Sequence, residues 1–373
     1  MCGVSGGWRL PLLDRLRSLF RRAPAVVASE GMAAAPRGLK RPQADHIIIL
    51  DGTMSTLKRG MESNAGLAFK LLAEGGPRAH RTVYYEPGLQ WTDWWHTPDV
   101  VQGRGLNRQI RRAYGWLASH YRPGDRIYLF GYSRGAYAVR SLAGVIDRVG
   151  LVRHTEATER NVQMAWRHYR RGPDTATARA FRNRFCHPDT AVQVVGVWDT
   201  VKALGLRLPL LWMLTEGRNA FHNHQLGRSV RHGFHALAMD ETRVAYAPVL
   251  WDCTEDWNGN VEQVWFRGGH GDVGGQIGGF ARARPLSNIP LVWMLERAEG
   301  AELMLPEGWR ARFPCDPGAP MCGTWRGWGA LFLYRRRRGI GRPGPLVQQL
   351  PELGEAPHAA EDELVIGLLV LAV

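Results

Sequence analysis

Cysteine, acidic residues and long apolar runs are all scarce in this sequence. The 373 residues include five cysteines, an odd number whose spacing matches neither a metal site nor a disulfide framework. We therefore expect a reducing compartment. No apolar run reaches the length of about 18 residues that a spanning helix needs, and no secretory signal is visible. These absences predict a cytoplasmic protein without a membrane-spanning segment.

Negative charge is outweighed by positive charge. Lys and Arg number 48 against 34 Asp and Glu, for a formal net charge of +14. Such a balance fits nucleic acid, an anionic membrane or acidic ligands, but no zinc-finger, helix-turn-helix or RNA-binding motif accompanies it, so we expect no nucleic acid partner. Residues 8–22 alternate apolar and arginine positions at helical spacing. This pattern is typical of an interfacial amphipathic helix on a membrane, and it also fits a helix docked on the domain or a start codon wrongly placed upstream of Met32.

Apolar residues are plentiful, at 45% of the chain, which is enough for a sizeable core. Short β-branched runs predict strands at 46–50, 81–85, 126–130, 191–197 and 261–266, and helical spacing predicts helices at 64–73, 106–121, 136–149 and 285–299, with a helical stretch over 153–185. This alternation indicates an α/β fold with a mostly parallel sheet flanked by helices. We expect one domain over 43–334, a basic extension over 1–42, and a basic and then apolar tail over 335–373.

One motif points to nucleophilic chemistry. Gly131-Tyr-Ser-Arg-Gly135 matches G-x-S-x-G and lies directly between a predicted buried strand and a predicted small-residue helix. That strand–turn–helix context is what a nucleophile elbow requires, because the serine sits on a strained turn whose neighbours must be small. Ser133 is therefore the candidate nucleophile. The backbone N–H of Arg134, at the helix N-terminus, is a candidate oxyanion donor. An ordinary glycine-rich turn with an idle serine is the alternative.

A serine nucleophile needs a base and an acid, in the usual chain order Ser, Asp or Glu, His. His270 follows the predicted strand at 261–266 and is surrounded by glycines, so we expect it to be the base. Asp199 follows the strand at 191–197, so we expect it to be the acid. Asp272 is the alternative acid, although it could instead fix the glycine loop; Asp240 and Asp252 are weaker alternatives.

The loop at Asp51-Gly52-Thr53 follows the first predicted strand, where this fold takes its second oxyanion donor. The N–H of Gly52 or of Thr53 is the candidate. Asp-Gly-Thr also occurs in haloacid-dehalogenase phosphatases, but Ile49 stands where their nucleophilic aspartate should be. Asp51 and a tryptophan-rich stretch are candidate substrate-lining residues, as is the apolar patch at 208–214; the tryptophans are Trp91, Trp94 and Trp95.

Histidine pairs raise the question of a metal. His222 and His224, and His232 and His235, stand at short spacings, but no carboxylate spacing accompanies them. We expect no metal and no cofactor.

Several motifs together resemble a known family. They are Leu50-Asp-Gly-Thr53, Tyr84-Tyr-Glu-Pro-Gly88, Phe130-Gly-Tyr-Ser-Arg-Gly-Ala-Tyr137, Gly196-Val-Trp-Asp-Thr-Val201, His235-Ala-Leu-Ala-Met-Asp-Glu241, Val264-Trp-Phe-Arg-Gly-Gly-His-Gly-Asp-Val-Gly-Gly275 and Leu286-Ser-Asn-Ile289. In this order they resemble a domain-of-unknown-function family within the α/β-hydrolases. Its characterised members include the catalytic domains of phospholipase effectors delivered by type VI secretion. The resemblance covers about residues 45–300.

The resemblance implies an α/β-hydrolase fold, a triad of Ser133, Asp199 and His270, and lipid esters as substrates. Together with the elbow it predicts a serine hydrolase that acts on carboxylic esters, with lipid or phospholipid esters first and a small-ester esterase second. A binding or regulatory module that kept the fold and lost the chemistry is the competing class. The sequence does not define the oligomeric state.

Overall fold

A single large sheet forms the centre of the molecule. The computed structural model describes residues 26–28, 41–74, 80–88, 104–201, 225–251, 257–325, 334–338, 347–349 and 364–366. The strands are β1 (Val26–Ala28), β2 (Asp45–Leu50), β3 (Arg81–Glu86), β4 (Arg126–Tyr132), β5 (Val192–Trp198), β6 (Val230–Ala238), β7 (Asn260–Phe266), β8 (Tyr334–Arg336), β9 (Val347–Gln349) and β10 (Leu364–Ile366). Their order in the sheet is β1-β3-β2-β4-β5-β6-β7-β9, and β8 pairs separately with β10.

The sheet is buried on both faces, which explains why its strands are apolar without alternation. In β2, Ile47 and Ile49 pack into one core, whereas Ile48 and Leu50 pack into the other. All four side chains are fully buried.

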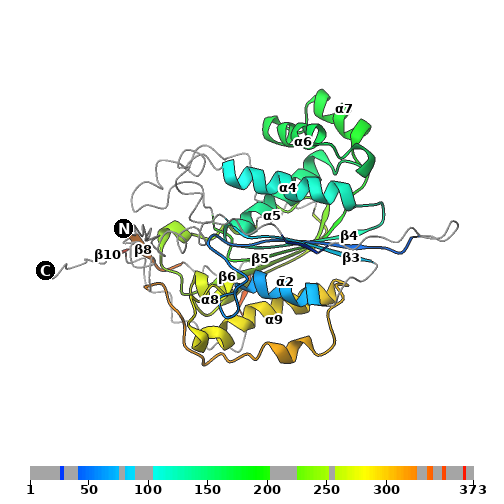
Figure 1. Cartoon of the computed structure of the whole chain (residues 1–373). Coiled ribbons are helices and arrows are strands. Elements are labelled where there is room, and N and C mark those ends of the chain that lie inside the picture. Colours follow the sequence, from blue (N-terminus) through cyan, green and yellow to red (C-terminus); the bar gives the residue numbers. More distant parts are fainter. Residues whose placement is uncertain are drawn as a thin grey trace, which may run out of the picture.

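Helices cover the two faces as separate layers (Figure 1). On one face α4, α5, α6 and α7 pack with the core of Ile48 and Leu50, and on the other α2, α8 and α9 pack with the core of Ile47 and Ile49. Their bounds are α2 Asn64–Glu74, α4 Arg104–His120, α5 Arg134–Val149, α6 Glu159–Arg171, α7 Ala176–Phe185, α8 His270–Gly274 and α9 Arg284–Gly300, with 3₁₀ turns η2 His154–Glu156, η5 Val244–Tyr246, η6 Ala281–Ala283 and η7 Trp309–Arg312.

Strand direction positions the functional residues. Among the described strands, every pair from β3 across to β9 is parallel, and β1 joins the sheet antiparallel. The carboxyl ends of β4, β5, β6 and β7 therefore lie along one edge, where open α/β sheets place their sites. This parallel sheet between two helical layers is the α/β-hydrolase fold that the sequence predicts.

Within the predicted domain over 43–334, the structure differs from the sequence prediction at β6 and at α8. The strand β6 was not expected, because its arginine, its two histidines and its Gly233 have low strand propensity. It forms because burial between β5 and β7 outweighs that propensity. His270 was expected in a glycine loop, but it is the first residue of the short helix α8.

Parts of both predicted end segments belong to the folded domain. β1 lies in the expected extension over 1–42 and pairs with β3, and β9 lies in the expected tail over 335–373 and pairs with β7. The amphipathic helix expected at residues 8–22 falls outside the described residues. Within the described part of the chain, no helix has the length and apolar character to span a membrane.

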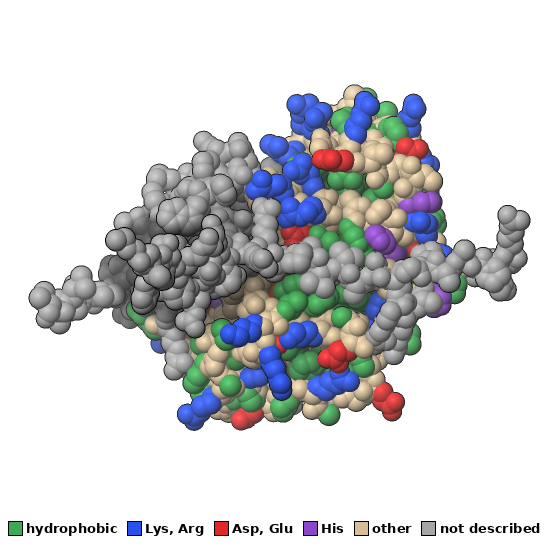
Figure 2. All heavy atoms as spheres, viewed as in Figure 1, with side chains coloured by type: hydrophobic (Ala, Val, Ile, Leu, Met, Phe, Trp, Pro, Cys, Tyr) green, Lys and Arg blue, Asp and Glu red, His purple; other side chains and the backbone are tan. Residues whose placement is uncertain are grey.

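Arginine side chains gather over α4 and α6 on the face drawn in Figure 2. A groove of about 410 Å³ between these two helices is lined by Arg108, Arg111, Arg167 and Arg170, together with Asn107, Gln163 and Trp166.

Candidate active site

Ser133 occupies a strained turn at the end of β4. Its backbone has φ 57° and ψ −117°, a conformation that a non-glycine residue adopts only when its surroundings impose it. The Ser133 N–H donates to the carbonyl oxygen of Trp198 at 3.1 Å and so ties the turn to β5. Two glycines make the turn possible: a Cβ on Gly135 would lie 2.0 Å from the Leu50 oxygen, and a Cβ on Gly131 would lie 2.6 Å from the Gly135 oxygen.

Three side chains from three strand ends form one hydrogen-bonded path. The Nε2 atom of His270 lies 2.8 Å from Ser133 Oγ, and its Nδ1 atom lies 2.6 Å from Asp199 Oδ2. Ser133 follows β4, Asp199 follows β5 and His270 follows β7. The rings of Tyr132 and Tyr246 lie against the imidazole, with centroids 4.9 and 4.8 Å away. The structure thus brings the three residues of the predicted triad together.

Three carboxylates fix the backbone that carries His270. The N–H of Gly268 donates to Asp240, that of Gly269 to Asp272 and that of His270 to Glu241, at 2.6, 3.0 and 3.1 Å. Asp272 also accepts from the N–H groups of Cys322 and Gly323. Asp272 therefore holds the backbone around Gly269. The carboxylate that contacts the His270 ring is that of Asp199. Asp252 lies outside the described residues.

Burial and neighbouring charges shift the pKa values of both His270 and Asp199. Burial lowers the pKa of His270 below its usual value, even though Asp199 and Glu241 raise it. Burial would raise the pKa of Asp199, but Arg338 and His270 more than offset that effect and leave it well below its usual range. Asp199 is therefore charged and His270 is neutral near neutral pH, which is the arrangement that general-base catalysis requires.

The loop after β2 lies against Ser133, as the sequence predicts, but its two candidate donors differ. A Cβ on Gly52 would lie 3.4 Å from Ser133 Cβ, so the loop is in contact with the elbow. The Gly52 N–H donates to Asp51 Oδ1 at 2.7 Å and so already has an acceptor. The Thr53 hydroxyl is buried and has no hydrogen-bond partner among the described residues. These contacts favour Thr53 over Gly52 as the donor.

Asp51, a predicted substrate-lining residue, is instead buried at the start of the loop that follows β2. Its side chain is fully buried, and its carboxylate also accepts from the hydroxyls of Ser63 and Tyr85 at 2.7 Å. Burial raises its pKa despite these bonds. Asp51 therefore holds the loop beside Ser133 and does not line a space open to substrate.

One residue of this cluster, Arg338, is not predicted by the sequence. Its guanidinium donates to both oxygens of Asp199, at 2.6 Å to Oδ1 and 3.0 Å to Oδ2. Arg338 belongs to a run of four arginines at 335–338 that was expected to form a basic tail. That run was the only signal in the sequence, and nothing in it indicated which arginine would contact Asp199.

Some of the remaining predicted residues are described by the structure and others are not. Trp91, Trp94 and Trp95, the patch at 208–214 and the pair His222 and His224 fall outside the described residues. His235 is buried in β6, where its Nε2 accepts from the Thr200 N–H at 3.1 Å. Burial lowers the pKa of His235 to about 3, so the ring is neutral.

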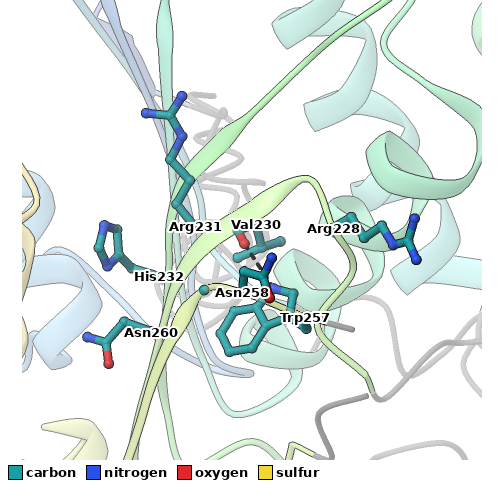
Figure 3. Close-up of a pocket in the computed structure, with 8 residues that line it drawn as sticks. Arg228, Val230, Arg231, His232, Trp257, Asn258 and Asn260 are labelled. Carbon is teal, nitrogen blue, oxygen red and sulfur yellow. Dashed lines mark hydrogen bonds between the residues drawn. The ribbon is translucent and has the colours of Figure 1, made fainter. Parts of the chain in front are cut away.

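His232 lies in a pocket at the opposite edge of the sheet. The pocket has a volume of about 920 Å³ and is lined by Arg228, Val230, Arg231, His232, Trp257, Asn258, Gly259 and Asn260 (Figure 3). Val230 and Asn260 are the first residues of β6 and β7, so this pocket is at the amino ends of the strands, whereas Ser133 is at the carboxyl end of its strand. The pocket is therefore separate from the hydrogen-bonded path.

Comparison with known proteins identifies one family. The profile of the family described as T6SS, phospholipase effector Tle1-like, catalytic domain matches residues 45–297. An uncharacterized protein of Saccharomyces cerevisiae, YEL023C, is 28% identical over 223 residues, which cover 53% of this chain and 31% of the yeast protein. This chain thus spans about a third of the length of that relative.

Two solved structures are also similar. A Tle1 effector bound to the VgrG spike of the type VI secretion system aligns with TM-score 0.36 and 17% identity, covering 63% of this chain and 51% of that chain. The esterase Est2 of Thermogutta terrifontis aligns with TM-score 0.39 and 13% identity, covering 78% of this chain and 93% of that chain.

Proposed function

The chain belongs to the family of Tle1-like catalytic domains of type VI phospholipase effectors, and from this membership we propose that it is a serine hydrolase that cleaves lipid esters. The observation that carries the proposal is the hydrogen-bonded path from Ser133 Oγ through His270 to Asp199. A nucleophile, a base and an orienting carboxylate in this arrangement perform acyl transfer on unrelated folds.

The reaction has two halves. Nε2 of His270 takes the proton of Ser133 Oγ as the oxygen attacks the acyl carbonyl carbon, and the same Nε2 then gives that proton to the departing alcohol. The acyl-enzyme remains. Water next loses a proton to Nε2 and attacks the acyl carbon, and Ser133 recovers its proton as the free acid leaves. Throughout, Asp199 keeps Nδ1 protonated and stabilises the imidazolium.

Negative charge on the carbonyl oxygen needs donors beside Ser133. The Arg134 N–H lies at the amino end of α5, where the helix dipole stabilises negative charge. Thr53 on the facing loop supplies its N–H and its buried hydroxyl as further donors. Gly52 contributes indirectly, because its bond to Asp51 shapes that loop.

The pH dependence of the reaction should follow His270. Because burial lowers the pKa of this histidine below 6.5, the neutral base persists in mild acid. We expect the acid limb of kcat/KM to have its midpoint below pH 6.5. The measurement is hydrolysis of a p-nitrophenyl ester across pH, followed at the isosbestic wavelength of p-nitrophenol. A midpoint at or above the ordinary histidine value would contradict the assignment.

The arginine groove between α4 and α6 supports an anionic lipid surface as the substrate environment. Of its seven described lining residues four are arginines and none is acidic. Burial lowers the pKa of His168 on α6, and the charges of Arg167 and Arg171 lower it further, which fits a positive potential here. Arginine forks bind phosphate in two-point contacts. The amino end of α4 and the helix α8 both lie in the left half of the molecule as drawn in Figure 1.

Removing charge from this groove should weaken membrane binding. Each arginine near an anionic surface contributes about 1 kcal/mol at most, and salt screens it. For Arg167→Gln with Arg170→Gln we expect a loss of roughly 10- to 30-fold in affinity for vesicles of phosphatidylcholine and phosphatidylglycerol at low salt. The matched control is Arg310→Gln with Arg312→Gln in η7, an equal charge change elsewhere. Equal binding by both pairs would show that only net charge matters.

Covalent labelling tests the proposed hydrolase activity. We expect a fluorophosphonate probe to label the wild type and not Ser133→Ala, with equal folding checked by circular dichroism. Short and long p-nitrophenyl esters and a phospholipid panel then rank the substrates. Hydrolysis of short esters alone would favour a small-ester esterase. A folded wild type that is not labelled, with or without phospholipid vesicles, would overturn the proposal and favour a non-catalytic module on this fold.

A further inference from the structure

The guanidinium of Arg338 is buried behind the predicted catalytic acid. Its side chain is 6% exposed, and its Nη1 and Nη2 atoms each donate to one oxygen of Asp199. Nη1 also donates to the carbonyl oxygen of Ala238 at 2.7 Å, and Nη2 to that of Tyr246. Arg338 lies 41 positions beyond residue 297, where the match to the family ends. The contact therefore comes from a segment that the family match does not include.

These bonds determine how the carboxylate of Asp199 is turned. Oδ1 accepts from Arg338 and from the Ala238 N–H at 3.0 Å, and Oδ2 accepts from Arg338 and from His270. A two-point arginine–carboxylate pair is planar and directional, so it fixes the rotation of the carboxylate. Asp199 itself has a positive φ of 39°, and such a backbone persists only where surrounding contacts hold it. Arg338 is one of those contacts.

The segment that carries Arg338 is anchored by buried contacts of its own. Arg335 is 2% exposed, stacks on Trp325 with its guanidinium carbon 3.4 Å from the ring centroid, and donates to the hydroxyls of Thr242 and Thr324. The backbone N–H of Arg336 donates to the Thr242 oxygen at 2.7 Å. These contacts of Arg335 and Arg336 fix the segment that positions Arg338 beside Asp199.

Arg338 also balances the charges around His270. The charged groups that act on the Asp199–His270 pair are Glu241 and Arg243 beyond β6, together with Arg338. The titratable neighbours are Tyr132, Tyr246 and His235, and His235 in turn lies near the charge of Arg140. The Glu241 carboxylate is paired with Arg243 at 2.6 Å, as Asp199 is with Arg338. Without Arg338, Asp199 would be the uncompensated charge next to the imidazole, and the imidazolium would be stabilised more.

We propose that Arg338 is a positioning residue for the Asp199–His270 pair, and that the docked segment 334–338 completes the active site. The inference rests on the proposed hydrolase function. Arg338 is placed to act through Asp199, because its guanidinium donates to both oxygens of that carboxylate and to two backbone carbonyl oxygens beside it.

Kinetics of three variants test the proposal. We expect Arg338→Met to lower kcat about 10- to 100-fold with KM nearly unchanged, as misplacement of a catalytic group does. Its acid limb should move to higher pH, because losing the positive charge beside Asp199 lets His270 bind its proton more tightly. Arg338→Lys keeps the charge and should restore the acid limb and part of kcat. The control, Arg337→Met, changes an exposed neighbour and should behave as the wild type.

A histidine NMR titration supplies a readout that needs no activity. The pKa of His270 should rise in Arg338→Met and stay near that of the wild type in Arg338→Lys and Arg337→Met. An unchanged His270 titration with unchanged kcat would overturn the proposal, as would a rise in kcat, which would make Arg338 an inhibitory contact. Should the wild type resist fluorophosphonate labelling, the hydrolase function fails separately, and the titration still decides whether Arg338 sets the proton affinity of His270.

Discussion

Replacing His270 with alanine should lower kcat for ester hydrolysis about 10⁶-fold and abolish fluorophosphonate labelling. Ser133 Oγ donates its proton to the one ring nitrogen that lies 2.8 Å away. Without that nitrogen the hydroxyl stays protonated and is a weak nucleophile at neutral pH. KM should change little, because the ring acts on Ser133 and on the leaving group. The measurement is kcat with a p-nitrophenyl ester, together with covalent labelling.

A second buried histidine provides the control for this variant. His46 is 1% exposed and bonds to Thr82 and Asp125, at the start of β2 and so at the amino edge of the sheet. His46→Ala should reduce the free energy of unfolding and leave kcat of the folded fraction unchanged. If both histidine variants kept wild-type kcat, His270 would not be the base. If both lost activity in step with stability, the effect would be one of folding.

Several carboxylates hold the backbone of the short segment 268–270 in place. Asp240, Asp272 and Glu241 each accept one of three successive N–H groups that lead into His270. Asp51 does the same for the oxyanion loop through Gly52. Glu241, Asp272 and Asp51 are buried, whereas Asp240 is exposed. Burying a carboxylate costs desolvation, and the hydrogen bonds to these three offset that cost. They hold flexible glycine-rich backbone in the one arrangement that joins three strand ends.

The elbow was predictable because its physical requirements are local. An apolar strand, two glycines around a serine and a small-residue helix all lie within a short stretch, and the steric reason for each glycine can be stated in advance. The order of Ser133, Asp199 and His270, each just after a strand, then placed them on one edge of a parallel sheet. The three residues lie close together because parallel strands have all their carboxyl ends on the same side of the sheet.

What the sequence could not predict depends on contacts between distant segments. The strand β6 has weak local propensity, and only its burial between two neighbours makes it a strand. That the Gly52 N–H is engaged follows from the rotamer of Asp51, which Ser63 and Tyr85 fix. Arg338 is separated from Asp199 by 139 positions. Its role depends on which of four adjacent arginines contacts Asp199, and neither periodicity nor composition encodes that.

Replacing Asp199 with asparagine should lower kcat about 10⁴-fold. The amide offers one oxygen and one NH₂ group where the carboxylate offers two acceptors, so it cannot satisfy both His270 Nδ1 and Arg338. The imidazole then takes the wrong tautomer, with its proton on Nε2, where it cannot accept from Ser133. The Arg338 guanidinium also keeps its buried position without a counter-charge. We therefore expect a loss of roughly 3–5 kcal/mol in the free energy of unfolding, measured by urea denaturation.

The double variant separates these two effects. Arg338→Met added to Asp199→Asn removes the unpaired buried charge, so most of the lost free energy of unfolding should return. The kcat should remain near that of Asp199→Asn, because the imidazole still lacks its orienting carboxylate. Recovery of activity along with stability would mean that Asp199 serves the fold and not the reaction. Recovery of stability alone would mean that Asp199 serves the reaction and that Arg338 acts through Asp199. This matches the order of the hydrogen bonds, which run from Ser133 to His270, then to Asp199 and then to Arg338.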